Sequence, residues 1–129
     1  MNNFNLASKQ KGASMWTLIF TSALVVLFAL ITMKLVPAYL ENNKVIHALE
    51  SLAETPGAAQ MSFGQVMQKI DNTLYIDLAS DLLDLKEALT ISKTKSTKVF
   101  TISYERVIPM AYNISALLDF ENSVEVPLK

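Results

Sequence analysis

The chain has 129 residues, a formal net charge of −1, no cysteine and a single histidine. This length allows one domain plus a hydrophobic segment. The missing cysteines exclude disulfides, thiolate nucleophiles and Cys-based metal sites, and one histidine argues against a zinc site. With Arg106 as its one arginine, the chain also lacks the basic footprint of a nucleic-acid-binding protein. We therefore expect no cofactor, no metal and no nucleic-acid partner.

The N-terminal part contains an uncharged, strongly apolar run from residue 13 to residue 33. As a helix, the run would extend about 31 Å at ~1.5 Å per residue, close to the ~30 Å thickness of the hydrocarbon core of a bilayer. A removable signal peptide is the competing interpretation, but its apolar region is usually only about 7–15 residues long. The run predicts one transmembrane helix, embedded in the lipid bilayer. The side chains that we expect to anchor it are Trp16, Phe20, Phe28 and Lys34.

The charges around this run indicate its orientation. Residues 1–12 contain lysines and no acid, whereas several glutamates follow the helix. The positive-inside tendency then favours a cytoplasmic tail over residues 1–12 and an exported C-terminal part. We expect a single-pass protein of the bacterial inner membrane with a periplasmic domain. Small residues in the span could also support self-association of the helix: Ser22, Ala23 and Ala29.

Residues 34–55 continue in helical spacing beyond the span. Pro37 either begins a new helix or kinks a longer one, and its closeness to the span favours a continuous, kinked rod. The sequence Thr-Pro-Gly at 55–57 is expected to end this juxtamembrane helix. Its apolar residues form one stripe: Val45, Ile46, Leu49, Leu52 and Ala53.

A second helix is predicted after Ser62, which forms a capping-box pattern with Gln65. Apolar residues then follow at helical spacing, in a stripe wide enough to lie on a sheet. The segment 80–87 is ambiguous, because a capping serine and acids would suit a short helical turn before the chain extends.

From Ala88 the apolar period changes from 3.6 to 2, which predicts strands over 88–94, 99–108 and 114–126. Pro109 is expected to interrupt the pairing, because proline cannot donate a ladder hydrogen bond. Short loops favour an antiparallel meander. One face of the second strand should carry Phe100, Ile102, Tyr104 and Arg106, and the inward residues of the third should be Ile114, Ala116, Leu118 and Phe120.

The predicted fold class is therefore α+β. An N-terminal transmembrane helix extends into a kinked rod, and a small periplasmic domain over residues 56–129 packs a helix on a three-stranded antiparallel sheet. This layout is pilin-like.

Enzyme signals are weak throughout the chain. The acid pairs Asp81/Asp84 and Glu105/Glu121 have no predicted cleft, so solvated carboxylates are the simpler interpretation. His47 has no nucleophile or second ligand near it in sequence. Arg106, beside Glu105 and opposite the third strand, predicts a cross-strand surface ion pair worth less than ~1 kcal/mol. We expect a protein that is not an enzyme and has no catalytic residues.

Two stretches resemble a known family: Lys-Leu-Val-Pro-Ala-Tyr-Leu-Glu at 34–41 and Asp-Phe-Glu-Asn-Ser-Val-Glu at 119–125. They are similar to a proteobacterial family of uncharacterised single-pass envelope proteins, the domain-of-unknown-function family 4845. The resemblance implies a short cytoplasmic tail, one inner-membrane helix and a small α+β periplasmic domain, with no assigned catalytic residues. Family members are often encoded beside the gene for signal peptidase I, so the resemblance raises export machinery as a candidate partner.

The basic N-terminus also resembles the leader of type IV pilins and pseudopilins, in which a peptidase cuts after a glycine. Here the candidate processing site is the bond between Gly12 and Ala13. Thr17 would then be the fifth residue, where those proteins carry a glutamate that pairs with a neighbouring subunit inside the membrane. The missing acid weakens this interpretation without excluding it.

Two functions remain open at this point. The first is a non-enzymatic inner-membrane protein whose periplasmic domain binds a membrane or periplasmic protein, and the alternative is a minor pilin or pseudopilin subunit of a type IV pilus or type II secretion system. For the first, the exposed third strand is a candidate docking edge for strand addition. Its residues are Leu118, Phe120, Val124 and Val126.

Overall fold

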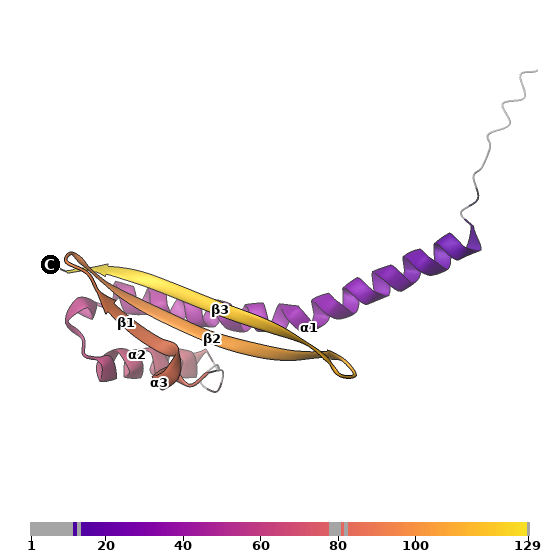
Figure 1. The fold of residues 1–129 in the computed structure, drawn as a ribbon. Coiled ribbons are helices and arrows are strands. Elements are labelled where there is room, and N and C mark those ends of the chain that lie inside the picture. The colour runs from indigo at the N-terminus through magenta and orange to yellow at the C-terminus, as the bar shows by residue number, and fades with distance from the viewer. Residues whose placement is uncertain (1–11, 13, 78–80, 82, 129) are drawn as a thin grey trace, which may run out of the picture. The chain divides into compact units, whose positions relative to one another are not determined.

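The computed structural model of the chain describes residues 12, 14–77, 81 and 83–128. The chain divides into two units, residues 1–32 and residues 33–129. A single helix, α1 (Met15–Glu54), begins in the first unit and ends in the second, which holds all the other described elements (Figure 1). The predicted α+β layout, a long apolar N-terminal helix followed by a helix and a three-stranded antiparallel sheet, is confirmed.

In the first unit, α1 is uncharged and mostly apolar, and its polar side chains are the hydroxyls of Thr17, Thr21, Ser22 and Thr32. The described part of the chain holds one helix long and apolar enough to cross a membrane, with a mean hydropathy of 2.3 over its best window and none of that window buried. The predicted anchor residues Trp16, Phe20 and Phe28 are exposed at 80%, 69% and 61%. This segment could therefore span a bilayer, where a surface of this kind is stable.

In the second unit, α1 continues through Pro37, so the rod is one unbroken helix. Proline removes one helical hydrogen bond but does not end the helix here. The helix stops at Glu54, and Gly57 then adopts a φ of 80°, a left-handed conformation that suits glycine. The predicted stop at residues 55–57 is confirmed.

Three short elements follow α1. A 3₁₀ turn, η1, covers Ala58–Gln60, and helix α2 covers Phe63–Ile76. The Ser62 side chain accepts from the Gln65 backbone while the Gln65 side chain accepts from the Ser62 backbone, which confirms the predicted capping box. A one-turn helix, α3 (Leu85–Ala88), is capped by Asp84, so the ambiguous segment does end in a helical turn.

The sheet has the order β1-β2-β3, with both pairs antiparallel. Its strands are β1 (Leu89–Lys93), β2 (Thr97–Ala111) and β3 (Ile114–Pro127). As Figure 1 shows, β2 and β3 are much longer than β1 and form one extended hairpin. The hairpin therefore continues well past the region that β1 covers.

The predicted interruption at Pro109 is wrong. Strand β2 continues through Pro109 to Ala111, and the pairing with β3 shows only a register irregularity between these two residues. Strand β1 pairs with β2 no further than Ile102. Beyond that point β2 is an edge strand in the described chain, and an edge tolerates a residue that cannot donate.

The core lies between the C-terminal half of α1, helix α2 and one face of the sheet. Phe100 and Ile102 are fully buried, as the alternation on β2 predicted. On β3, however, Ile114 is 64% exposed, so its predicted inward position is wrong. It follows the turn of the hairpin, outside the buried cluster. The large side chains that are completely enclosed are Phe100, Leu52, Ile70, Leu74, Ile102, Val45 and Val66.

Candidate functional site

A polar cluster joins α1 to the sheet at a buried position. Asn42 of α1 is only 9% exposed. Its Oδ1 accepts from Asn122 Nδ2 at 2.7 Å and from the Tyr104 hydroxyl at 3.1 Å. Its Nδ2 donates to Asn122 Oδ1 at 3.4 Å. The three side chains come from α1, β2 and β3, so the cluster ties one helix to two strands.

This environment changes the acidity of Tyr104. Burial raises the pKa of its hydroxyl from 10.0 to about 12, against the lowering effect of the nearby Arg106 and with a smaller raising effect of Glu41. Tyr104 therefore stays protonated over the physiological range and keeps its donor for Asn42. The Tyr104 ring also lies 5.4 Å from that of Phe120, centroid to centroid.

The ion pair of Arg106 differs from the predicted one. Arg106 does not bridge the strands: its Nη2 donates to Glu41 Oε2 on α1 at 2.7 Å. The side chain leaves β2 on the face that carries Tyr104, and this face is turned toward the helix. Its cross-strand neighbour on β3 is Leu118, which offers no charge. The pair is partly exposed, with side-chain exposures of 37% and 31%.

Lys34, a predicted anchor residue, makes a contact that the sequence did not reveal. Its ammonium donates to the backbone carbonyls of Pro109, at 2.8 Å, and of Met110. These carbonyls lie near the far end of the β2–β3 hairpin. The residue that directly follows the apolar run is thus bonded to the hairpin.

The single histidine also acquires a partner. His47 Nδ1 lies 3.1 Å from Asp77 Oδ2, next to the C-terminal end of α2. The histidine side chain is 64% exposed, and the described residues contain no group of three metal-binding side chains. A surface contact between two helices accounts for this pair.

The proposed docking edge lies mostly on the covered face of the sheet. Phe120 and Val126 are 8% exposed, and Leu118 and Val124 are half-buried. Their side chains cannot meet a partner without unpacking the helices. The backbone edge is different, because β3 pairs with β2 alone in the described part of the chain.

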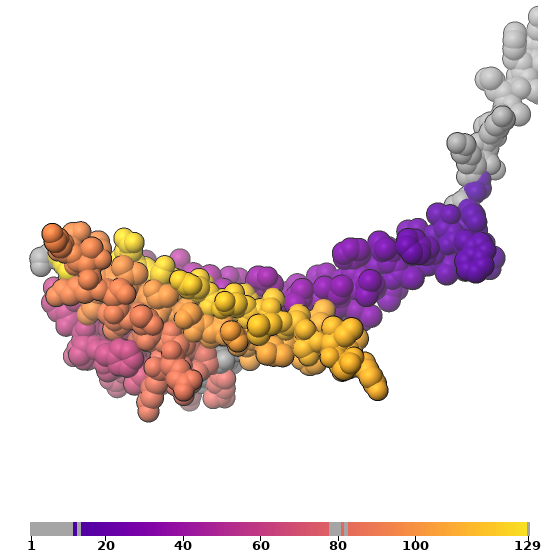
Figure 2. Space-filling model, in the orientation of Figure 1, coloured from indigo at the N-terminus to yellow at the C-terminus, as the bar shows by residue number. Residues whose placement is uncertain are grey.

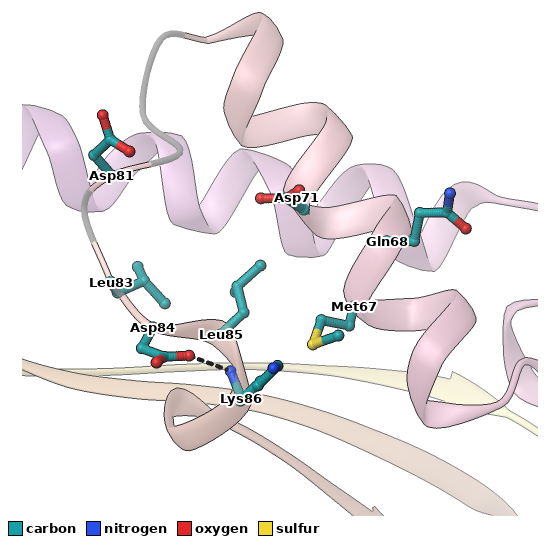
Figure 3. A pocket seen from close by; sticks show the side chains of 8 residues that line it. All are labelled: Met67, Gln68, Asp71, Asp81, Leu83, Asp84, Leu85 and Lys86. Atoms are coloured by element: carbon teal, nitrogen blue, oxygen red, sulfur yellow. Dashed lines mark hydrogen bonds between the residues drawn. The ribbon is translucent and has the colours of Figure 1, made fainter.

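An open hollow of about 690 Å³ lies beside α2 and α3, as Figure 3 shows. Asp84, one member of a predicted acid pair, lines this hollow. Its carboxylate already has a structural role, because its Oδ1 accepts from the Lys86 backbone at 3.0 Å and caps α3. In Figure 3 the Asp81 carboxylate points away from Asp84. The other predicted pair, Glu105 and Glu121, lies exposed on the open face of the sheet. Neither pair forms an enclosed carboxylate site.

The candidate processing site at the N-terminus lies partly outside the described residues. Gly12 is exposed, and Ala13 lies outside the described residues, so the candidate processing site has no described geometry. The small residues Ser22, Ala23 and Ala29 are exposed on α1.

A family model matches residues 34–120, and its description is "Domain of unknown function (DUF4845)". The chain belongs to this family. The match includes the whole 34–41 motif but only Asp119 and Phe120 of the second motif, and it begins directly after the apolar run. No curated protein and no solved structure matches the chain. The DUF4845 segment contains every residue of the Asn42, Glu41 and Lys34 contacts except Asn122.

Proposed function

We propose that this DUF4845 chain is a single-pass protein of the bacterial inner membrane whose α+β domain binds another envelope protein and catalyses no reaction. The apolar, unburied first part of α1 supports the anchor. The observation that carries the binding role is the free edge of β3, a strand of 14 residues that pairs on one side alone in the described chain. Partners in the export machinery remain candidates.

A long free strand edge is an unusual feature to leave uncovered. It presents unpaired N–H and C=O groups that template the addition of another strand. In strand addition the main chain supplies most of the affinity, so the burial of Phe120 and Val126 is no obstacle. The outward side chains of β3 include Asp119, Glu121 and Glu125, all exposed. Because complementary charge favours association, the expected partner strand is basic or flanked by basic residues.

Site-specific photocrosslinking in native membranes tests this role. A photoreactive amino acid at Ser123, exposed on β3, should give a discrete crosslinked product. The same residue at Asn72, exposed on α2, is the matched control and should give none. Equal products at both sites, or none at Ser123, would contradict binding at this edge.

The orientation can be tested separately, because the chain has no cysteine. A single cysteine introduced at Lys95, exposed in the β1–β2 turn, should react with a membrane-impermeant maleimide when only the outer membrane is permeabilised. A cysteine at Asn5 should react only after the inner membrane is opened. The reverse pattern would place the domain in the cytoplasm.

A second candidate function is a processed minor pilin-like subunit. The continuous 40-residue α1, whose second part packs on an antiparallel sheet, favours it. The intact mass of the protein extracted from native membranes decides between the two. Loss of residues 1–12 would support pilin-type processing, and a full-length mass would leave the plain anchor.

A further inference from the structure

The far end of the β2–β3 hairpin is an exposed apolar surface. We call residues 107–117 the hairpin tip, and it contains no charged residue. Arg106 and Asp119 are the nearest charges on either strand. Figure 2 shows this end of the hairpin projecting from the body of the second unit. Its exposed large apolar side chains, with their exposures, are Val107 66%, Tyr112 104%, Ile114 64% and Leu117 59%.

The residue at the turn is strained. Tyr112 and Asn113 form the two-residue turn between β2 and β3, and Tyr112 has a φ of 49°. Glycine or asparagine is the usual residue for positive φ in a hairpin turn, and a bulky side chain is an outlier there. The hairpin turn imposes the positive φ, but a bulky side chain is an unusual choice there, and a backbone outlier of this kind points toward function. The Tyr112 ring is fully exposed, so it does not pack against the described part of the domain.

The hairpin tip lies beside the residue that follows the apolar run. Lys34 donates to the carbonyls of Pro109 and Met110, and it is the first charged residue after residues 13–33. A lysine in this position belongs at the membrane surface, with its ammonium among the headgroups. Atoms bonded to that ammonium must then lie at the same surface.

We propose that the hairpin tip docks on the lipid bilayer, in the headgroup region where α1 leaves the membrane. The proposal rests on the membrane anchor of the proposed function. Tyr112, Ile114 and Leu117 would enter the interface, while Arg106 and Asp119 stay in water. The domain then has two attachment points, α1 and the hairpin tip, which would restrict its rotation about the helix.

Lipid fits this surface better than a protein partner does. Tyrosine is enriched at membrane interfaces, where its ring is buried and its hydroxyl stays hydrated. Apolar side chains are also exposed on α1 within two turns of Lys34, where Val36, Tyr39 and Leu40 are 44%, 53% and 58% exposed. A band of exposed apolar groups that follows the exit point of the helix is what a bilayer surface would cover.

Depth-dependent quenching by brominated lipids tests the inference on the full-length chain in liposomes of phosphatidylethanolamine and phosphatidylglycerol. The chain has a single tryptophan, Trp16, in the anchor helix, and its quenching reports whether α1 is in the membrane. The tip reporter is Tyr112→Trp in a Trp16→Phe background. Leu117→Trp repeats the measurement at an ordinary strand position. Lys95→Trp, in the turn at the opposite end of β2, is the matched control. Both of these variants are also made in the Trp16→Phe background.

We expect Trp16 to be quenched, both tip reporters to lose a similar share of their emission with a blue shift, and Lys95→Trp to keep its emission. Quenching of Trp16 with unquenched tip reporters would overturn the docking of the tip and leave the anchor standing. A blue shift of the tip reporters without quenching would overturn it in favour of contact with a second copy. Quenching of the Lys95→Trp control would also overturn it, since the contact would not be specific to the tip. An unquenched Trp16 would overturn both the anchor and the inference.

Discussion

Within the second unit, α1 contacts the sheet in two regions that differ in chemistry. From Val45 to Leu52 the contact is apolar: Val45 and Leu52 are fully buried and belong to one cluster with Phe100. From residue 34 to residue 42 it is largely polar, through Lys34, Glu41 and Asn42. The same helix and the same strand pair thus make a core at one end and a series of hydrogen bonds at the other.

The two regions of α1 have different roles: one mainly stabilises the fold, and the other mainly fixes the position of the helix on the sheet. Apolar burial is non-directional and roughly proportional to area, so the apolar region should supply most of the folding free energy. Hydrogen bonds have strict geometry, and a shifted register would leave the buried Asn42 and the half-buried Asn122 without partners. The polar region should therefore fix where the helix lies along the hairpin while contributing less to stability.

The largest expected effect is in the apolar region. Phe100→Ala should lower the free energy of unfolding by about 3–5 kcal/mol, the usual cost of removing a fully buried aromatic ring. Urea unfolding of the full chain in detergent micelles, followed by circular dichroism of the sheet, measures it. Val107→Ala is the control, because that side chain is 66% exposed and its truncation should have little effect. Equal losses in the two variants would contradict the placement of the core.

In the polar region, Asn42→Leu should cost about 1–3 kcal/mol, because it leaves Asn122 and Tyr104 without their shared acceptor. The neighbouring Asn43→Leu is a matched control: the same change at an exposed position should stay within about 0.5 kcal/mol. The same urea titration compares the two. If Asn42→Leu left the free energy of unfolding unchanged, the polar cluster would not fix the position of α1, and the proposed difference between the two regions would be wrong.

Much of the fold was predictable, since it depends on local patterns. The apolar run, the capping box at Ser62 and the alternation on β2 each carry their structural meaning within a few residues. The strand through Pro109 was not predictable in this way, because it depends on how far β1 extends along β2. The exposure of Ile114 depends likewise on where the core ends, which is a property of the assembled fold.

The contacts at the candidate site were harder to predict because their partners are distant in sequence. Arg106 and Glu41 are 65 residues apart, and Asn42 and Asn122 are 80 apart. A single sequence shows that Arg106 shares a face with Tyr104, but not which helix residue will lie opposite. One signal was present: a polar residue, Asn42, falls close to the apolar stripe of the rod, and a buried polar group needs a partner.

The next effect should be smaller and dependent on pH. Tyr104→Phe removes one donor from the cluster and should cost about 1 kcal/mol near neutral pH. Burial raises the pKa of Tyr104 to about 12 from 10.0, so the folded state holds this proton more tightly than the unfolded state does. The contribution of the protonated Tyr104 to the free energy of unfolding is therefore complete below pH 10, and it is lost as the pH rises through 12.

Urea midpoints at pH 8 and pH 11 measure this dependence. The wild-type chain should lose more stability between the two values than Tyr104→Phe does, because the variant lacks the titrating group. Tyr75→Phe, at a 72% exposed position on α2, is the control and should follow the wild type. If Tyr104→Phe follows the wild type as well, the alkaline loss arises elsewhere in the chain.

The smallest expected effect is at the ion pair. A double-mutant cycle of Arg106→Met and Glu41→Gln should give a coupling energy of about 0.2–1 kcal/mol, because the pair is partly exposed and solvent weakens it. High salt should reduce the coupling further. Arg106→Met combined with Glu105→Gln is the control, since the exposed Glu105 side chain points to the other face. A coupling well above this range would mean that the polar region stabilises the domain as well as positioning α1, and the division between the two regions would have to be abandoned.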